Sequence, residues 1–558
     1  MQLSSIPNSR LLSQLGMGVL LMLVMWVRIT HSLDFTDEMQ YYGQIKGLTE
    51  SDKLFTSDLF IQQVVYLLFY PIFKIYHLIF DFEYFVLFGR LLLASAIFAL
   101  YFYLFYGLNK LGVGAFGAGL VAFAISFAIP YHGIFAISYN TISQILWVVF
   151  LIRFLNWPKE RNYLWSLICG AVVFAHPPSA IVMFSLVMAR YCLERQLRQS
   201  LYFVIELFCL AILTTIVSLQ FATSVQYLSS LKFSSAFGVG KTFLSGYDGP
   251  ILLLKMIFLF IFSKYILARM GQCLLLVLLL SFSIYYLVEC FLGGAEAYIY
   301  LNVKLLVIFA AIGYALFQAK VVSVRSPSVS RADWLVVLTV FYSATLCITS
   351  SNGVGQATGA FMVVTPLMIG LNLCYIGRSP SALVRFSISL SMIVLSCAFV
   401  VHWIYNPYRD QSWLRSDEEI TTVSEFKGIY VSIQRLNFIT HIVQSFRSDV
   451  QGRRILVAGG LPAFYFLTGA VPETCMYFFH SLPAEGADIE FRKCMLTKNP
   501  EMVLSLFEHS ISANTKSLGE RYINEFTMNR SFNCSERIVK LERVSADAGL
   551  SSHWNFCR

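Results

Sequence analysis

The sequence predicts a polytopic α-helical membrane protein with about thirteen transmembrane helices and a small extracytoplasmic α/β domain at its carboxyl end. Of the 558 residues, 57% are hydrophobic and only 13% are charged, whereas an average soluble domain carries about 25% charged residues. The mean hydropathy is +0.66. Apolar runs recur along the first 404 residues, and the composition turns polar after them. These properties exclude an ordinary soluble enzyme, a disordered protein and a nucleic-acid-binding module.

The individual spans follow from apolar runs that approach the length of about 20 residues needed to cross a bilayer. We predict spans at residues 12–30, 86–108, 112–130, 137–155, 162–176, 178–193, 201–222, 250–268, 272–292, 298–319, 333–350, 358–376 and 385–404. Residues 1–404 therefore form a transmembrane domain, and residues 405–558 form a second domain. In that second domain, residues 454–462 are typical of a buried strand followed by a turn, and residues 498–512 and 514–527 are typical of short helices.

The orientation follows from the basic residues, which account for the net charge of +9. With a cytoplasmic amino terminus and the first span retained as an anchor, they gather in cytoplasmic loops as the positive-inside rule requires. These residues are Lys110, Arg153, Lys159, Arg161, Arg190, Arg195, Arg198, Arg269, Lys320, Arg325, Arg331, Arg378 and Arg385. An odd number of spans then places residues 405–558 outside. We expect the cytoplasmic (inner) membrane of a bacterium, with this domain in the periplasm.

The cysteines agree with this side assignment. Eight of the twelve lie in apolar stretches, where a thiol behaves as a small hydrophobic group. The other four, Cys475, Cys494, Cys534 and Cys557, lie in the polar carboxyl-terminal part. An even number there predicts two disulfides in an oxidising compartment, with the pairing left open.

The first outer loop, residues 31–85, is the most informative segment for function. It is acidic although the chain is basic, and Asp34, Asp37 and Glu38 lie together directly after the first span. The loop is also long, as functional loops often are. Residues 59–76 are amphipathic and predict interfacial helices lying on the bilayer. Carboxylates on a surface are often merely solvated, and that alternative stays open for these three.

A family resemblance begins at this loop. A first span followed at once by Asp37-Glu38-Met-Gln-Tyr41, and then by a long loop with interfacial helices, resembles the GT-C class of polyprenol-phosphate-dependent glycosyltransferases. That class includes the protein O-mannosyltransferases and the aminoarabinose transferases of lipid A. Ser57-Asp58 and Tyr70-Pro71 occupy roughly the places of later elements in the family pattern. The segment 405–409, Tyr-Asn-Pro-Tyr-Arg, followed by an outer domain, resembles uncharacterised bacterial members.

The resemblance implies transfer of a sugar from a polyprenyl-phosphate donor to a glycan, lipid or protein acceptor on the outer face. Such transfer needs a base for the acceptor hydroxyl and a cation for the leaving phosphate. Asp37 is the candidate base. Glu38 would orient it, bind the acceptor or help hold a divalent metal, which is the one cofactor in question. Asp34 is a weaker candidate. The predicted cytoplasmic face offers only short basic loops, so the donor is expected to be lipid-carried rather than a nucleotide sugar.

Further residues on the predicted outer side are candidates for binding the donor or substrate, although each also has a plain structural interpretation. Lys241 lies in the outer loop 223–249, where a flexible glycine-flanked lysine could contact a lipid phosphate, and Arg409 could do the same. Asn352 lies in a polar glycine-rich loop, and His176 precedes Pro177-Pro178 at a helix end. The candidate binding residues are Tyr41, Asp58, His176, Lys241, Asn352 and Arg409. His132, Tyr139 and Asn140 fall at another outer helix end.

Two alternative functions stay open. A polysaccharide polymerase or ligase would also use lipid-linked sugars, although the late outer loop at 350–357 lacks arginines. A lipid-linked glycan transporter, or flippase, would be expected to carry mid-span ionisable groups and internal repeats. A receptor whose outer domain binds a partner would leave the acidic segment without a role.

Overall fold

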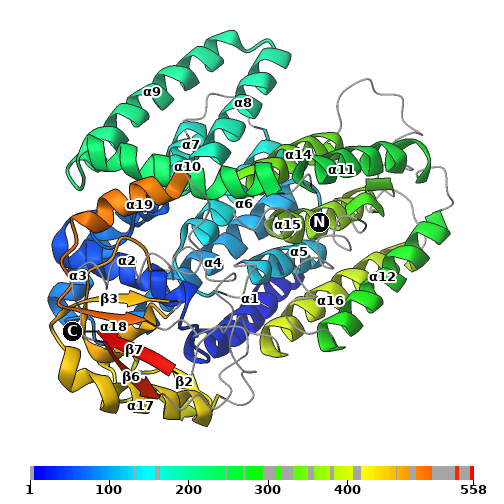
Figure 1. Cartoon of the computed structure of the whole chain (residues 1–558). Helices are drawn as coiled ribbons and strands as arrows, with labels where there is room; N and C mark the ends of the chain where they lie inside the picture. The colour runs from blue at the N-terminus through cyan, green and yellow to red at the C-terminus, as the bar shows by residue number, and fades with distance from the viewer. Residues whose placement is uncertain are drawn as a thin grey trace.

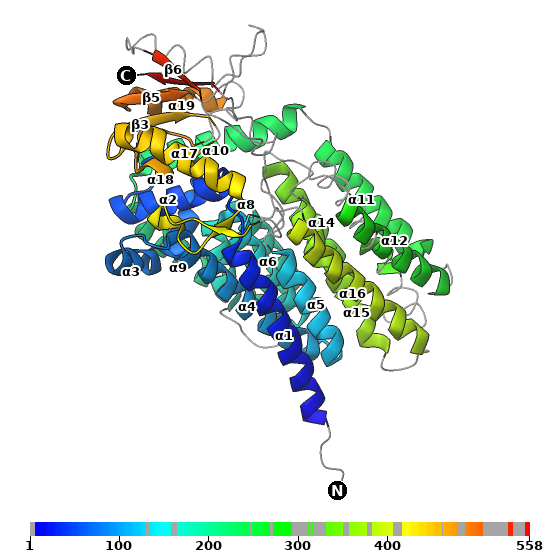
Figure 2. The same ribbon diagram turned by 90° about the horizontal axis from the view of Figure 1, so that it is seen from below.

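The computed structural model is mostly helical. It describes residues 6–129, 134–157, 164–245, 248–267, 272–292, 308, 310–312, 314–315, 331–349, 357–376, 382–405, 416–459, 461–477, 486–505, 534–538 and 553–557, in parts by backbone alone. The carboxyl-terminal α/β unit lies at one end of the helices, and the start of the first helix, at Ile6, lies at the opposite end (Figure 2).

Long helices fill the first 405 residues (Figure 1). They are α1 (Ile6–Thr30), α4 (Phe85–Lys110), α5 (Ala115–Ala128), α6 (Tyr139–Leu155), α7 (Leu164–Ala175), α8 (Pro177–Leu193), α9 (Leu197–Leu219), α10 (Ser224–Ser245), α11 (Asp248–Tyr265), α12 (Gln272–Leu292), α14 (Arg331–Thr349), α15 (Ala357–Ile376) and α16 (Ala382–Tyr405). A helix coincides with every predicted span except 298–319, most of which lies outside the described residues.

The apolar character of these helices is that of a membrane protein. Among the described residues, α4 and α9 are both long and apolar enough to cross a bilayer, and eight further apolar helices are shorter. Many large apolar side chains of α9 are exposed, as on a surface that faces lipid; they include Leu201, Phe208 and Leu213. The full count of thirteen spans stays a prediction.

Helix α5 forms the centre of the bundle, in contact with α1, α4, α15 and α16. Its residues from Gly117 to Ala128 are all buried. Small side chains allow close approach of neighbouring helices. A Cβ added at Gly370 of α15 would lie 2.5 Å from Cγ2 of Val121 on α5, so the two helices meet where a glycine leaves space.

The first outer loop is largely helical. It contains α2 (Asp37–Ser51), the 3₁₀ helix η1 (Ile61–Leu68) and α3 (Tyr70–Phe80). The axes of η1 and α3 differ by 71°, and the two together qualify as a third apolar span if they are counted as one. The sequence-based expectation of helices in residues 59–76 is confirmed; their position at the membrane surface stays a prediction.

Helix α10 differs from the sequence-based expectation. Residues 223–249 were expected to form a flexible outer loop, but Ser224–Ser245 is helical. It packs against α19 and η1. The buried Ser230 donates a hydrogen bond to Leu59 O at 2.6 Å. The segment is too polar to predict as a span, yet its contacts with other outer segments stabilise a helix.

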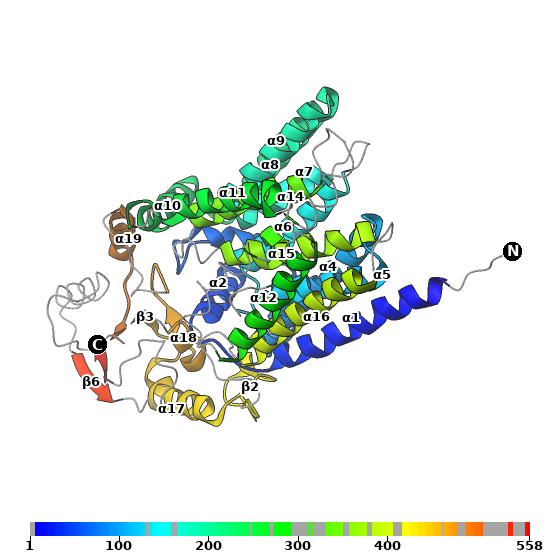
Figure 3. The same cartoon turned by 90° about the vertical axis from the view of Figure 1, so that its right-hand side faces the viewer.

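The carboxyl-terminal unit contains a mixed five-stranded sheet in the order β4-β3-β5-β7-β6. Strands β4 (Val471–Pro472), β3 (Arg454–Ala458) and β5 (Met502–Ser505) are parallel. Strand β7 (His553–Cys557) is antiparallel to β5, and β6 (Cys534–Ile538) is antiparallel to β7. The helices are α17 (Ile433–Val450), α18 (Ala463–Thr468) and α19 (Gly486–Leu496), with a short turn η5 (Ser424–Phe426) and the ribbon β1 (Glu418–Glu419) and β2 (Tyr430–Val431). Figure 3 shows this unit beside α2 and the carboxyl-terminal end of α1.

The predicted strand after residue 454 is confirmed as β3. The helix predicted at 498–512 is wrong, because residues 502–504 are buried and pair with β3 on one side, and 503–505 pair with β7 on the other. A short apolar run of this length does not distinguish a strand from a helix. The helix predicted at 514–527 lies outside the described residues.

One disulfide joins the segment after β4 to α19. Cys475 and Cys494 are bonded, with their Cα atoms 6.2 Å apart. Cys534 and Cys557 are directly opposite each other in the register of β6 and β7. The register thus offers a pairing for the second predicted disulfide.

Peptide mapping without reductant should recover two cross-linked pairs, Cys475–Cys494 and Cys534–Cys557. Opposite residues on antiparallel strands have Cβ atoms only about 4.5–5.5 Å apart, close to disulfide geometry. The thiols of Cys169 and Cys397 should be alkylated after unfolding and serve as internal controls, because both are free in the structure. Alkylation of Cys534 or Cys557 before reduction would contradict the second pairing.

Candidate active site

The acidic segment after α1 is held in place from two sides. Ser32 N donates to Tyr430 O at 2.9 Å, and Ala463 N donates to Phe35 O at 3.2 Å. The guanidinium of Arg435 lies 4.4 Å from the ring centroid of Phe35. The carboxyl-terminal unit therefore fixes residues that lie about 400 positions earlier in the chain.

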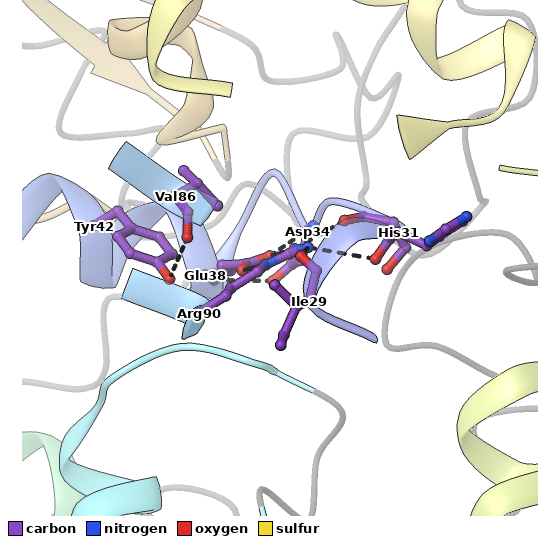
Figure 4. A network of polar contacts seen from close by, with 8 residues as sticks. Ile29, His31, Asp34, Glu38, Tyr42, Val86 and Arg90 are labelled. Atoms are coloured by element: carbon purple, nitrogen blue, oxygen red, sulfur yellow. Dashed lines mark hydrogen bonds and ion pairs between the residues drawn. The ribbon is translucent and has the colours of Figure 1, made fainter. Parts of the chain in front are cut away.

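Arg90 of α4 holds the other side through a buried ion pair with Glu38 (Figure 4). Its Nε and Nη2 donate to Oε1 and Oε2 of Glu38 at 2.7 and 2.8 Å. Its remaining N–H groups donate to the carbonyls of Ile29, His31 and Ser32 at 3.0, 3.4 and 2.8 Å. The five donors of one guanidinium thus tie α4, the end of α1 and the start of α2 together.

Close packing of α2 on α4 accompanies this ion pair. Tyr42 O–H donates to Val86 O at 3.2 Å. A Cβ on Gly89 would lie only 2.4 Å from Cε1 of Tyr42, so the glycine is required for the ring to lie there. The face of α2 that carries Glu38 and Tyr42 therefore packs on α4.

Asp34 and Glu38 also form a reciprocal cap at the start of α2. The N-cap residue Thr36 has no capping side-chain bond of its own. Instead, Asp34 accepts from Thr36 N and Glu38 N at 3.0 Å each, and Glu38 accepts from Asp34 N at 3.2 Å. Carboxylates stabilise the positive end of a helix. Asp34 and Glu38 therefore have a structural role, because they cap the start of α2.

Asp37 points elsewhere. It is partly exposed, and Tyr41, four residues later, shares its face of α2. The ring of Tyr41 lies edge-on to Tyr139 of α6 at 6.4 Å. Asp37 is itself close enough to act electrostatically on Tyr139. The structure thus brings together Asp37, Tyr41 and Tyr139, with Asn140 following on the same helix turn.

A half-open cavity of about 710 Å³ adjoins Tyr139. Its walls come from η1, the corner between α7 and α8, the end of α9 and one side of α10. The lining is mainly aliphatic and aromatic, and Tyr139, His176 and Tyr227 contribute polar atoms. His176 is also tied locally, since its Nδ1 lies 2.6 Å from Ser179 Oγ. The predicted binding residue His176 therefore lines the same cavity as Tyr139, the member of the Asp37 cluster that reaches it.

Asp58 is buried between α2 and the carboxyl-terminal unit, with 1% of its surface exposed. Oδ2 accepts from Gln44 Nε2 at 2.7 Å and from Gln40 Nε2 at 3.0 Å. Oδ1 accepts from Phe60 N at 3.1 Å. These donors are all neutral, and no ion pair of Asp58 is found among the described residues. Burial raises the pKa of Asp58 to about 6, and the hydrogen bonds from Gln44, Phe60 and Gln40 limit the rise.

The remaining candidates are not brought to this cluster. Lys241 falls in the second half of α10, where the backbone alone is described, within a helix rather than the expected flexible loop. Asn352, Arg409 and His132 lie outside the described residues.

Sequence reasoning missed two arginines. Arg90 lies within the predicted span 86–108 and is buried. Arg28 of α1 is also buried, with its guanidinium 4.6 Å from the centroid of Phe135. A signal for both was present, because a lone arginine inside an apolar span is costly and usually has a specific partner.

The residues around the acidic motif do not fit a metal site. Among the described residues, no group of three or more histidine, cysteine and acidic side chains is close enough to hold an ion. Both oxygens of Glu38 already accept from Arg90, so Asp37 and Glu38 do not form a pair of ligands.

Comparison with known proteins adds no assignment. No protein-family model matches the chain, and a search of curated proteins finds no relative.

Glu38→Gln should strongly destabilise the protein, because it leaves the buried Arg90 guanidinium without its counter-charge. Breaking a buried ion pair from one side costs about 3–5 kcal/mol. The readout is the melting temperature of the purified full chain in detergent. Asp52→Asn is the matched control in the same loop, since its pair with Lys74 is largely solvated and such pairs contribute little. Equal melting temperatures for the two variants would contradict the anchoring role of Arg90.

Asp58 should make stability depend on pH. Its folded pKa of about 6 lies above the ordinary value of 3.8, so the folded state binds the proton more tightly. The free energy of unfolding should therefore fall as pH rises from about 4 to about 6, by ~3 kcal/mol in total. Asp58→Asn should remove this component of the melting-temperature profile. Asp81→Asn, at an almost fully exposed carboxylate, should keep the wild-type profile; a pH profile unaltered by Asp58→Asn would contradict the assignment.

Proposed function

We propose that this chain is an integral membrane glycosyltransferase of the GT-C type, which transfers a sugar from a polyprenyl phosphate to an acceptor on the outer face of the membrane. The observation that supports this function best is the position of Asp37. It lies partly exposed at the start of α2 and acts electrostatically on Tyr139, which lines a largely apolar cavity of about 710 Å³. A carboxylate next to an apolar cavity suits a reaction between a lipid-borne donor and a polar acceptor.

The proposed topology has thirteen spans, a cytoplasmic amino terminus and an outer carboxyl-terminal unit in a bacterial cytoplasmic membrane. It is supported by the apolar helices, by the basic residues of the predicted cytoplasmic loops and by the Cys475–Cys494 disulfide. Disulfides persist in oxidising compartments such as the periplasm.

The cavity beside Tyr139 would hold the prenyl chain next to the sugar. Side chains such as Ile61, Val64 and Leu231 would cover the chain, and burial of apolar surface supplies binding free energy at about 25 cal/mol per Å². His176 and Tyr139 would face the polar head of the donor. Lys241, Asn352 and Arg409 are proposed contacts of its phosphate or sugar.

In the proposed reaction, Asp37 takes the proton of the acceptor hydroxyl. The hydroxyl oxygen forms a bond to the anomeric carbon from the face opposite the phosphate, and the bond from that carbon to the phosphate oxygen breaks. Polyprenyl phosphate leaves with the bonding electron pair, so the anomeric configuration inverts. General-base assistance of this kind contributes about 10²–10⁴-fold to a rate.

Glu38 has a positioning role in this proposal rather than a catalytic one. Its oxygens are engaged by Arg90 and by Asp34 N, so it fixes the first turn of α2 and with it the direction of Asp37. Asp58 fixes the middle of the same helix through Gln40 and Gln44.

Asp37→Asn should reduce sugar transfer at least 100-fold while leaving the melting temperature within about 2 °C of wild type, because the amide retains the shape but cannot take the proton. The measurement is mass spectrometry of cell-surface glycans, lipids and glycoproteins from a deletion strain complemented with each variant. Asp81→Asn is the matched control, an exposed carboxylate of the same loop. Full product formation by Asp37→Asn would overturn the proposal, as would accumulation of an unmodified substrate in sealed vesicles with no covalent product.

A further inference from the structure

A second cleft, of about 600 Å³, opens where three separate segments meet. One wall is the end of α2 with the residues after it, another is α10, and the third is the carboxyl-terminal unit around β4 and the end of α19. The Cys475–Cys494 disulfide braces the third wall. Leu59 N donates to Cys475 O at 3.0 Å, which joins that wall to the first one.

The lining chemistry is that of a site for a polar, hydroxyl-rich ligand. Short hydroxyl side chains recur in it, at Ser51, Thr56, Ser57, Ser229 and Thr497. Those of Ser51, Ser57, Ser229 and Thr497 donate their hydrogens within the protein. Each of these oxygens keeps lone pairs that can accept from a sugar hydroxyl. Phe55 and Pro472 add apolar surface on which the carbon face of a sugar ring can pack.

The charged lining residues select against an anionic ligand. They are two carboxylates, Glu50 and Glu473, and one ammonium group, Lys498. Lys498 Nζ already donates to Thr56 O at 2.5 Å, and Glu473 accepts from Asn499 N at 3.3 Å. The excess of negative charge disfavours a phosphorylated or uronic acid-rich ligand and permits a neutral one.

The cleft and the apolar cavity lie on two sides of one wall. Gln226 and Ser229 of α10 line the cleft, whereas Tyr227, Leu231 and Ser234 of the same helix line the apolar cavity. Ile61 N donates to Ser234 Oγ at 2.9 Å, so the first outer loop completes the wall.

The cleft also has a fixed distance to Asp37 along α2. Gly47 lines the cleft ten residues after Asp37, and a helix rises ~1.5 Å per residue, so the two are about 15 Å apart. A ligand in the cleft would therefore reach Asp37 only if it were extended.

From these contacts we infer that the cleft binds a neutral oligosaccharide, as the acceptor of the transfer. The identity as acceptor rests on the proposed function, whereas carbohydrate binding rests on the cleft alone. The chain end would lie near Asp37, and the inner sugar units would lie in the cleft between the carboxyl-terminal unit and α10.

The test measures the binding of oligosaccharides to the full chain in lipid nanodiscs, with saturation-transfer-difference NMR as the readout. The probes are maltohexaose, cellohexaose and chitohexaose, with hexagalacturonate as the anionic probe. At least one neutral hexasaccharide should bind, and hexagalacturonate should bind at least tenfold more weakly. Thr497→Trp should weaken the neutral probe at least tenfold by filling the cleft. Leu496→Trp is the matched control, because Leu496 is 76% exposed and does not line the cleft.

Glu473→Gln provides a second variant that adds no bulk and should also weaken binding, with folding monitored by melting temperature. Failure of all three neutral probes to bind the wild type, or equal binding by Thr497→Trp and Leu496→Trp, would overturn the inference. Asp37→Asn should bind the hexasaccharide as the wild type does. If Asp37→Asn keeps full transfer activity while the cleft variants lose binding, the proposed function fails and the carbohydrate site stands. If Asp37→Asn loses transfer but no neutral hexasaccharide binds the wild type, the proposed function stands and the carbohydrate site fails.

Discussion

The ion pair between Arg90 and Glu38 is the contact on which the arrangement of the acidic segment and α2 depends. Both side chains are almost fully buried, and the remaining N–H groups of Arg90 are used by carbonyls at the end of α1. A buried pair of this kind costs desolvation free energy, and geometry with every donor satisfied offsets that cost. Its consequence is directional: with Glu38 turned to α4, the neighbouring Asp37 is turned to α6.

The carboxyl-terminal unit holds the same acidic segment from its other side. Backbone bonds from Ser32 to Tyr430 and from Ala463 to Phe35 hold the acidic segment, and the Cys475 carbonyl holds Leu59 beside Asp58. The unit is thus part of the framework of the site. This double support explains how a loop of more than fifty residues can keep one carboxylate in a defined place beside an apolar cavity.

The proposed chemistry follows from the contrast between the two openings on either side of α10. One is lined chiefly by aliphatic and aromatic groups, and the other carries hydroxyls and a few charges among its apolar groups. A transfer from a lipid to a sugar needs both environments next to each other, because a prenyl chain is buried among apolar groups and an oligosaccharide needs hydrogen-bonding groups. Helix α10 and the segment from Leu59 to Ile61 form the boundary between them, and Asp37 lies at the apolar side through Tyr139.

Periodicity and composition by themselves determined the helical membrane class, all but one of the helix positions at the predicted spans, and the strand at 454–458. These features depend on local hydropathy, which the sequence displays directly. The tertiary structure decided the rest. It pairs Glu38 with an arginine 52 residues away, so that Glu38 and Asp37 face different helices. It also makes a helix of residues 224–245 and a strand of residues 502–505, where a helix was expected. The physical reason is common to all three: each outcome depends on a partner distant in the chain, and no local pattern encodes which partner a side chain will meet.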